Sequence, residues 1–217
     1  MATQTHPLLK LMRIALCITL LSVWSEIQAG GWATAVLNHL PEFAVRDKPV
    51  KITFSIKQHG VHPLKELTVH ILARNEATGE KQRFAVSELA DGLYTSELRF
   101  PSPGFWDWEI KSIWPGPSAM PQIEVIESST SPVHETTSYQ LGAKLFVAKG
   151  CIQCHGNARI SENVKSFQIA IDLTNYAASA QFLHLWLQSP KAVRPDSKMP
   201  AQNLSKDEID ALTAFLL

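Results

Sequence analysis

The chain has 217 residues, 45% of them hydrophobic, and its 20 basic and 20 acidic side chains give a formal charge of zero. This balance argues against a protein that binds nucleic acid or an acidic membrane surface through a basic patch. The length is enough for one large or two small domains.

The first 29 residues have the pattern of an export signal. Lys10 and Arg13 precede an apolar run over residues 14–24. That run is shorter than the roughly 20 apolar residues that span a bilayer, and it has the length of a signal-peptide core. We therefore predict a signal peptide over residues 1–29, with cleavage after Ala29. The alternative is that the segment is kept as a membrane anchor.

Cleavage there would change both the charge and the cysteine content. It would remove two of the 20 basic and one of the 20 acidic side chains, leaving 18 and 19 and a formal charge of −1. It would also remove Cys17 and leave only Cys151 and Cys154. The mature chain would then have no cysteine available for a structural disulfide.

Residues 30–126 have the sequence pattern of an all-β domain. Short alternating apolar runs are separated by turn residues such as Asp91-Gly92 and Pro103-Gly104, and no helical period occurs. Seven or so strands at regular spacing indicate an antiparallel, immunoglobulin-like sandwich. We expect strands near residues 33–37, 50–56, 67–73, 83–86, 93–100, 105–110 and 123–126.

This region also resembles the small periplasmic β-domains called YtkA-like or FixH-like. The resemblance rests on Gly31-Trp32-Ala33, on Gln58-His59-Gly60, and on the segments 91–94 and 100–106. It implies a fold more than an activity, and it is consistent with an extracytoplasmic location.

Histidines in the β-domain raise the question of a copper site. His59 and His62 are three residues apart in a turn, and His39, His70 and Met120 lie elsewhere in the domain. Periplasmic β-sandwiches can bind copper through imidazole and thioether ligands. Two histidines in a turn without a cysteine are explained more simply as solvated side chains, which we favour.

A polar linker and a helical domain follow. Residues 127–138 are rich in Ser and Thr and have no apolar period, which indicates an exposed linker. From residue 139 the period becomes helical. We expect helices capped by Ser138 and by Ser179, and a last helix that starts with a capping box between Ser205 and Glu208.

The strongest motif is Cys151-Ile152-Gln153-Cys154-His155. The spacing C-x-x-C-H is the attachment signature of a c-type haem, in which each thiol adds to one vinyl group and the histidine becomes the proximal iron ligand. A thioredoxin-like redox pair needs a βαβ context, and a zinc site needs four ligands. Neither requirement is met here, so we predict one covalently bound haem c.

Residues 139–217 resemble the class I c-type cytochrome domain. The matching features, in chain order, are Gly142 and Phe146, the haem motif, a middle helix, Lys198-Met199-Pro200 and a final helix. The resemblance implies that the first and last helices cross, with Gly142 allowing close approach of Phe215. It also implies that a proline carbonyl holds the proximal histidine, but Ala170-Ile171 stands at that place.

The sixth iron ligand can be argued from the residues themselves. Met199 is the only methionine of the haem domain, and it lies on a proline-punctuated polar loop where a core role is hard to explain. His184 is the competing ligand, although its helix neighbours account for it as a surface residue. We therefore predict His155 and Met199 as the axial ligands of the haem iron.

These features predict an exported single-haem c-type cytochrome that transfers electrons, with a β-domain for partner docking. It would be an electron carrier rather than an enzyme, alone or as a subunit of a larger oxidoreductase. We expect redox proteins, including membrane respiratory complexes, as partners in the bacterial periplasm or at the outer face of the cytoplasmic membrane, and neither nucleic acid nor a small-molecule substrate. The alternatives are a haem-based gas sensor and a copper-handling periplasmic module with an attached redox domain.

Overall fold

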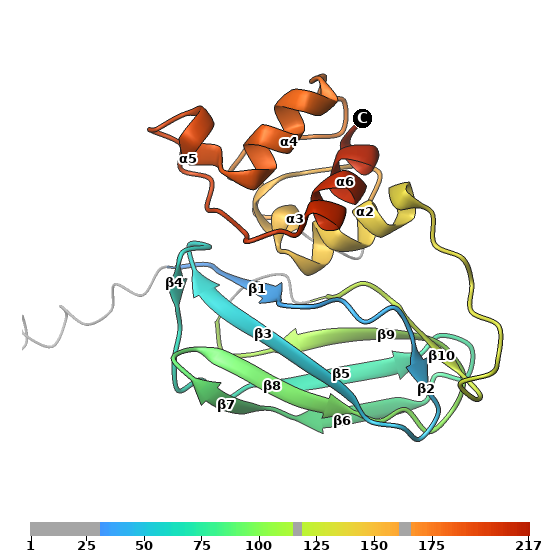
Figure 1. Cartoon of the computed structure of the whole chain (residues 1–217). Helices are drawn as coiled ribbons and strands as arrows, with labels where there is room; N and C mark the ends of the chain where they lie inside the picture. The colour runs from blue at the N-terminus through green and yellow to red at the C-terminus, as the bar shows by residue number, and fades with distance from the viewer. Residues whose placement is uncertain (1–30, 115–118, 161–165) are drawn as a thin grey trace, which may run out of the picture. The chain divides into compact units, whose positions relative to one another are not determined.

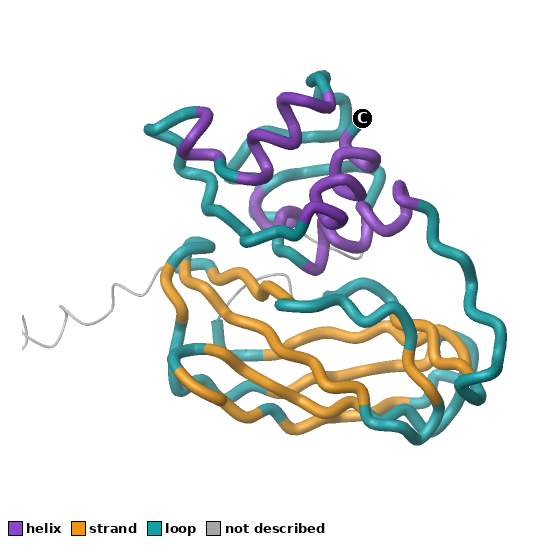
Figure 2. The backbone as a smooth tube through the Cα atoms, viewed as in Figure 1, coloured by secondary structure: helices purple, strands orange, loops and turns teal. Residues whose placement is uncertain are grey.

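The computed structural model describes residues 31–114, 119–160 and 166–217 (Figure 1). The predicted export segment, with Cys17 and the cleavage point at Ala29, lies outside the described residues. Residues Trp32–Leu217 form one compact unit that contains two hydrophobic cores. Strands build the first part of this unit and helices build the second (Figure 2).

The strands form two sheets. The first has the order β1 (Ala33–Leu37), β3 (Val50–Gln58), β8 (Leu93–Leu98) and β7 (Ser87–Ala90), with β4 (His62–Pro63) also paired to β3. The second has the order β2 (Ala44–Val45), β10 (Ile123–Ile126), β9 (Gly104–Lys111), β5 (His70–Asn75) and β6 (Lys81–Ala85). All pairs are antiparallel except β2 with β10.

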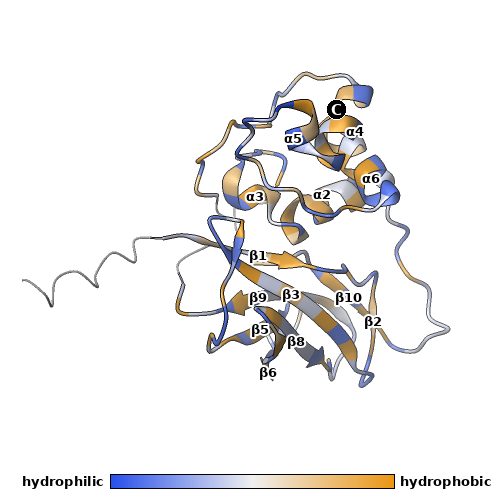
Figure 3. Ribbon diagram, turned by 60° about the vertical axis from the view of Figure 1, so that its left-hand side comes forward, coloured by the Kyte–Doolittle hydropathy of each residue, from blue (hydrophilic) through white to orange (hydrophobic). Residues whose placement is uncertain are grey.

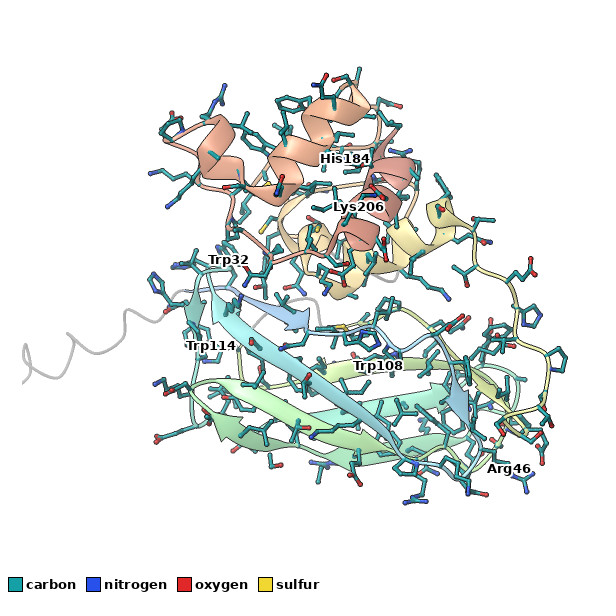
Figure 4. The ribbon with its side chains drawn as sticks, in the orientation of Figure 1. Trp32, Arg46, Trp108, Trp114, His184 and Lys206 are labelled. Atoms are coloured by element: carbon teal, nitrogen blue, oxygen red, sulfur yellow. The ribbon has the colours of Figure 1, made fainter. Side chains whose placement is uncertain are left out.

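One core lies between the two sheets, which makes the region a sandwich. Burial alternates along β3, where Ile52, Phe54 and Ile56 are buried, and the hydropathy colours alternate along the same strand (Figure 3). Trp106 and Trp108 of β9 share the buried face, because residues two apart lie on the same side of a strand. Their indole N–H groups donate to the carbonyls of Ser102 and Pro121 over 3.0 and 2.7 Å. Figure 4 labels Trp108 among the strands.

The predicted all-β immunoglobulin-like fold of this region is confirmed, and most strand positions agree with the sequence. The segment predicted at 67–73 begins as a strand only at His70, because Leu67–Val69 continue the preceding irregular stretch. The short strands β2, β4 and β7 were not predicted from the sequence. Two to four residues are too few to show a period of two.

The helical part contains α2 (Ser138–Ala148), α3 (Cys151–Cys154), α4 (Ala180–Gln188), α5 (Pro190–Val193) and α6 (Lys206–Leu216). Ser179 caps α4, and Ser205 with Glu208 forms the predicted capping box of α6. The predicted cap Ser138 is wrong by one residue. Thr137 caps α2, because its hydroxyl accepts from the backbone of Gln140 while the Gln140 side chain accepts from the Thr137 backbone.

Helices α2 and α6 cross at Gly142. A methyl group built on Gly142 would collide with the Ala211 carbonyl oxygen and would lie 2.7 Å from Cβ of Phe215. Only glycine permits this separation, so the close approach expected from the cytochrome resemblance is present. The Phe215 ring then packs 5.5 Å from the ring of Phe146, centroid to centroid.

Helix α4 buries a different face from the one the sequence suggests. By helical spacing, Phe182, Leu185 and Trp186 share one apolar face of α4. The buried residues are instead Leu183 and Leu187, and Leu185 is 52% exposed. Phe182 and Trp186 instead stack on each other, with ring centroids 5.7 Å apart. The two aromatic rings therefore lie at the margin of the core.

The segment between the two cores is polar and mostly exposed, as the sequence predicts. It is nevertheless attached to the sandwich, because Nδ1 of His134 lies 2.6 Å from a carboxylate oxygen of Glu124 in β10. The His134 side chain is otherwise open to solvent. Among the described residues, no helix is both long and apolar enough to cross a membrane.

Candidate haem site

The two cysteines of the attachment motif lie on one short helix. Gly150, with a φ of +76°, turns the chain in the left-handed region directly after α2, and Cys151 and Cys154 are the first and last residues of α3. Residues three apart lie on the same side of a helix, so both sulfur atoms can face one edge of a ligand. Both cysteines are free thiols rather than a disulfide.

The thiols are held in their neutral form. Burial raises the pKa of Cys151 to about 12, with a smaller contribution from the neighbouring Cys154, and burial also raises the pKa of Cys154. Thioredoxin-like pairs need a thiol whose pKa is lowered, and zinc needs thiolates. In the described part of the chain, moreover, no three His, Cys, Asp or Glu side chains come together as a metal site.

His155 follows α3, and its ring is fixed by a backbone carbonyl. Nδ1 of His155 lies 2.8 Å from the carbonyl oxygen of Ile171. The nitrogen that donates to a carbonyl carries the proton, which leaves Nε2 with a free lone pair for a metal. Ile171 therefore does here what the family's proline carbonyl is expected to do.

The segment carrying Ile171 is bound to the motif by backbone hydrogen bonds. The amide of Ala170 donates to the carbonyl of Cys154 over 3.1 Å, and the amide of Leu173 donates to that of Gly156 over 2.8 Å. A methyl group on Gly156 would collide with the carboxylate of Asp172. These contacts fix the Ile171 carbonyl without the rigid ring of a proline.

Met199 lies on the loop after α5, where it packs partly buried against the helical core. The indole N–H of Trp186 donates to the Met199 sulfur over 3.0 Å. The Met199 amide donates to Oγ of Ser197 over 3.2 Å. The sequence did not predict that Trp186 would donate a hydrogen bond to Met199. A tryptophan on an apolar helix face gives no sign of where its N–H points.

His184, the competing ligand, is occupied elsewhere. Nε2 of His184 lies 3.4 Å from Asp210 of α6, and the same carboxylate binds Lys206 over 2.5 Å. Figure 4 labels His184 and Lys206 on these two helices. The pairing is consistent with a surface role for His184.

The donors around the helical core fit haem c. Cys151, Met199 and the apolar side chains of Ile160 and Tyr176 all pack against the same core cluster. The two thiols would form the thioether bonds, and the neutral imidazole of His155 and the soft thioether of Met199 would supply the protein's ligands to the iron. The assignment of His155 and Met199 as iron ligands stays a prediction.

The histidines of the β-domain are dispersed by contrast. His62 in β4 is exposed, and the His59 ring packs 5.3 Å from that of Trp32. Met120 is buried in the sandwich core, only 5% exposed. Burial lowers the pKa of His70, and the positive charges of Arg83 and Lys111 act in the same direction.

The helical region is therefore a haem-binding domain with the arrangement of a c-type cytochrome. Residues 139–217 match the family model described as Cytochrome c. Proteins of this family bind covalent haem c, which agrees with the C-x-x-C-H motif, and the predicted cytochrome c fold of this region is confirmed. A search among curated proteins found no match.

Solved structures resemble the β-rich part only weakly. A crystal structure of the Lin-41 filamin domain aligns with a TM-score of 0.37 and 9% identity, covering 43% of this chain and 93% of that one. Domains 4 and 5 of the S-layer protein SbsC align with a TM-score of 0.30 and 15% identity, covering 45% and 54%. The chain thus spans about half of the SbsC structure, and neither likeness carries an argument about function.

Proposed function

We propose that this protein is an exported, single-haem c-type cytochrome that carries electrons between redox proteins. One haem c is bound through Cys151 and Cys154, with His155 and Met199 as its axial ligands. The observation that carries the proposal is the hydrogen bond from His155 Nδ1 to the Ile171 carbonyl, which leaves Nε2 for iron. A haem with His and Met ligands supplies reversible one-electron chemistry at a raised potential, with no open coordination position.

The polypeptide orients the two proposed iron ligands and places polar groups beside them. The Ile171 carbonyl fixes the His155 ring, and Trp186 directs an N–H at the sulfur of Met199. Both interactions restrict the orientation of the ligand side chain. Little rearrangement on electron transfer is what a carrier requires.

The β-domain serves to dock the redox partner, and the protein works outside the cytoplasm. The basic and apolar pattern of residues 1–29 and the YtkA-like or FixH-like resemblance of residues 30–126 support this location. The near-zero net charge leaves recognition to local surface features. Partners would be proteins of a respiratory chain, including membrane complexes, and the protein could act as a subunit of a larger oxidoreductase.

A redox titration of the haem-loaded full chain tests the electron-carrier proposal. We expect a single reversible one-electron step, and a ferrous form whose absorption spectrum does not change on exposure to carbon monoxide. Rapid carbon monoxide binding to the ferrous protein would contradict a carrier and support the haem-based gas sensor, in which Met199 leaves the iron.

A further inference from the structure

Strand β1 is buried on both of its faces, although it is an edge strand of its sheet in the described structure. A strand of a sandwich normally buries alternate residues, yet all five residues of β1 are buried. Ala33, Ala35 and Leu37 belong to the sandwich core, whereas Thr34 and Val36 do not. Another part of the chain must therefore cover Thr34 and Val36.

The turn that leads into the haem motif provides this cover. A methyl group built on Gly150 would lie 3.3 Å from Cγ2 of Val36 and 3.8 Å from Cβ of Thr34. Lys149, also buried, donates to the carbonyl of Asn38 over 3.0 Å and pairs with Glu208 over 2.7 Å. The end of α2 is thus packed directly on β1.

Gln153, which lies between the two cysteines of the motif, forms hydrogen bonds with the backbone at the free edge of β1. Its Oε1 accepts from the amide of Ala35 over 3.1 Å, and its Nε2 donates to the Ala35 carbonyl over 3.2 Å. The side chain is only 1% exposed. The carboxamide takes the place of a neighbouring strand, whose N–H and C=O groups would otherwise satisfy this edge.

The Met199 loop and the segment that follows the cysteine motif also touch the sandwich. A methyl group built on Gly60, in the turn between β3 and β4, would lie 3.6 Å from Cγ of Pro200, the residue after Met199. Trp32, just before β1, packs its ring 5.5 Å from that of Phe167. The amide of Phe167 donates to the carbonyl of Gln153 over 2.9 Å.

We propose that the sandwich holds the two ligand-bearing segments of the haem domain in fixed relation, with Gln153 as the positioning residue. Contacts on β1 fix the Cys151–His155 segment, and the turn at Gly60 limits movement of the Met199 loop. The β-domain then stabilises the Met199–iron bond and regulates access to the iron. This inference rests on the proposed haem ligation and extends it to regulation by the β-domain.

The test uses the haem-loaded full chain and the change Gln153→Leu, which keeps much of the volume but removes both bonds to Ala35. Cyanide must displace Met199 from ferric haem, so its apparent affinity reports how often the loop opens. We expect cyanide to bind about tenfold more tightly, which corresponds to about 1.4 kcal/mol and to the scale of one buried hydrogen bond. Gln181→Leu, on an exposed glutamine of α4, should leave the affinity unchanged.

Hydrogen exchange provides a second readout that requires no external ligand. In Gln153→Leu, the backbone amides of Met199 and of residues 201–204 should exchange faster, while those of α4 keep their wild-type rates. If that variant does not fold, Gln153→Glu keeps an acceptor for the Ala35 amide, loses the donor to its carbonyl, and should show the same changes.

An intact fold with unchanged cyanide affinity and unchanged exchange at Met199 and residues 201–204 would overturn the inference. So would lower thermal stability without either change, since Gln153 would then have only a structural role. Failure of the ligand assignment is distinguishable, because the unmutated protein would bind cyanide or carbon monoxide without displacing Met199.

Discussion

Nδ1 of His155 lies 2.8 Å from the carbonyl oxygen of Ile171, in a segment without the proline that c-type cytochromes usually have there. Backbone hydrogen bonds to Cys154 and Gly156 hold this segment in place. A carbonyl without a proline ring is therefore enough to fix the His155 ring, and hydrogen bonding to the Cys151–His155 segment is sufficient to position that carbonyl.

Replacing Met199 with alanine should lower the reduction potential and let carbon monoxide bind the ferrous iron. The reason is loss of the soft thioether, which favours Fe(II). Redox titration and absorption spectra of the two oxidation states measure both effects. His184→Ala is the matched control, because it removes only the surface pair with Asp210. The reverse pattern, with changes in His184→Ala alone, would refute the ligand assignment.

Replacing Trp186 with phenylalanine should lower the potential while Met199 stays bound. The indole N–H donates to the sulfur and reduces the electron density that the sulfur gives to iron, so its removal favours Fe(III). We expect a smaller shift than in Met199→Ala and no reaction with carbon monoxide. An unchanged potential would mean that the N–H does not act on the iron ligand.

Replacing Gly142 with alanine should destabilise the helical domain, because the new methyl group would meet the Ala211 backbone. Overpacking of this kind costs about 1–3 kcal/mol of unfolding free energy. Chemical denaturation followed by helical circular dichroism measures it. Lys144→Ala, in the same helix, should change the unfolding free energy by no more than about 0.5 kcal/mol. Equal stability of the two variants would show that the crossing can widen without penalty.

Asp172 should contribute to the acid sensitivity of the protein. Hydrogen bonds from the side chain and then the backbone of Thr174 lower the pKa of Asp172 from its ordinary value of 3.8. A group whose pKa is lowered by folding stabilises the folded state above its ordinary pKa, and this contribution is lost as pH falls through the lowered value.

Asp172→Asn should therefore be less stable than the unmutated protein at neutral pH, and the difference should shrink below pH 3.8. Unfolding by denaturant at a series of pH values measures this, with Asp196→Asn on an exposed loop as the control. A difference that stays constant through the acid range would show that the Asp172 carboxylate is not the group responsible.

The parts of this structure that the sequence could predict are those that depend on residues close together in the chain. The haem motif and the capping box at Ser205 follow from short-range rules, and the structure contains the capping box as expected. The close approach at Gly142 was expected only from the resemblance to c-type cytochromes, and it is also present. Strands with a clear period of two, such as β3, were also placed correctly.

Contacts between distant residues were not predictable. Gln153 is hydrogen-bonded to Ala35, 118 residues away in the sequence, and no sequence pattern around either residue indicates the contact. The same holds for Trp186 and Met199, because the direction of an indole N–H depends on the packing of the whole helix. Which carbonyl holds His155 likewise required the path of the loop.

The most direct test of the whole account is the intact mass of the protein produced together with a c-type haem attachment system. The account predicts the polypeptide mass plus one haem, and loss of that increment when Cys151→Ala and Cys154→Ala are combined. A mass equal to the bare polypeptide in the unmutated protein, or an increment that survives both substitutions, would contradict it.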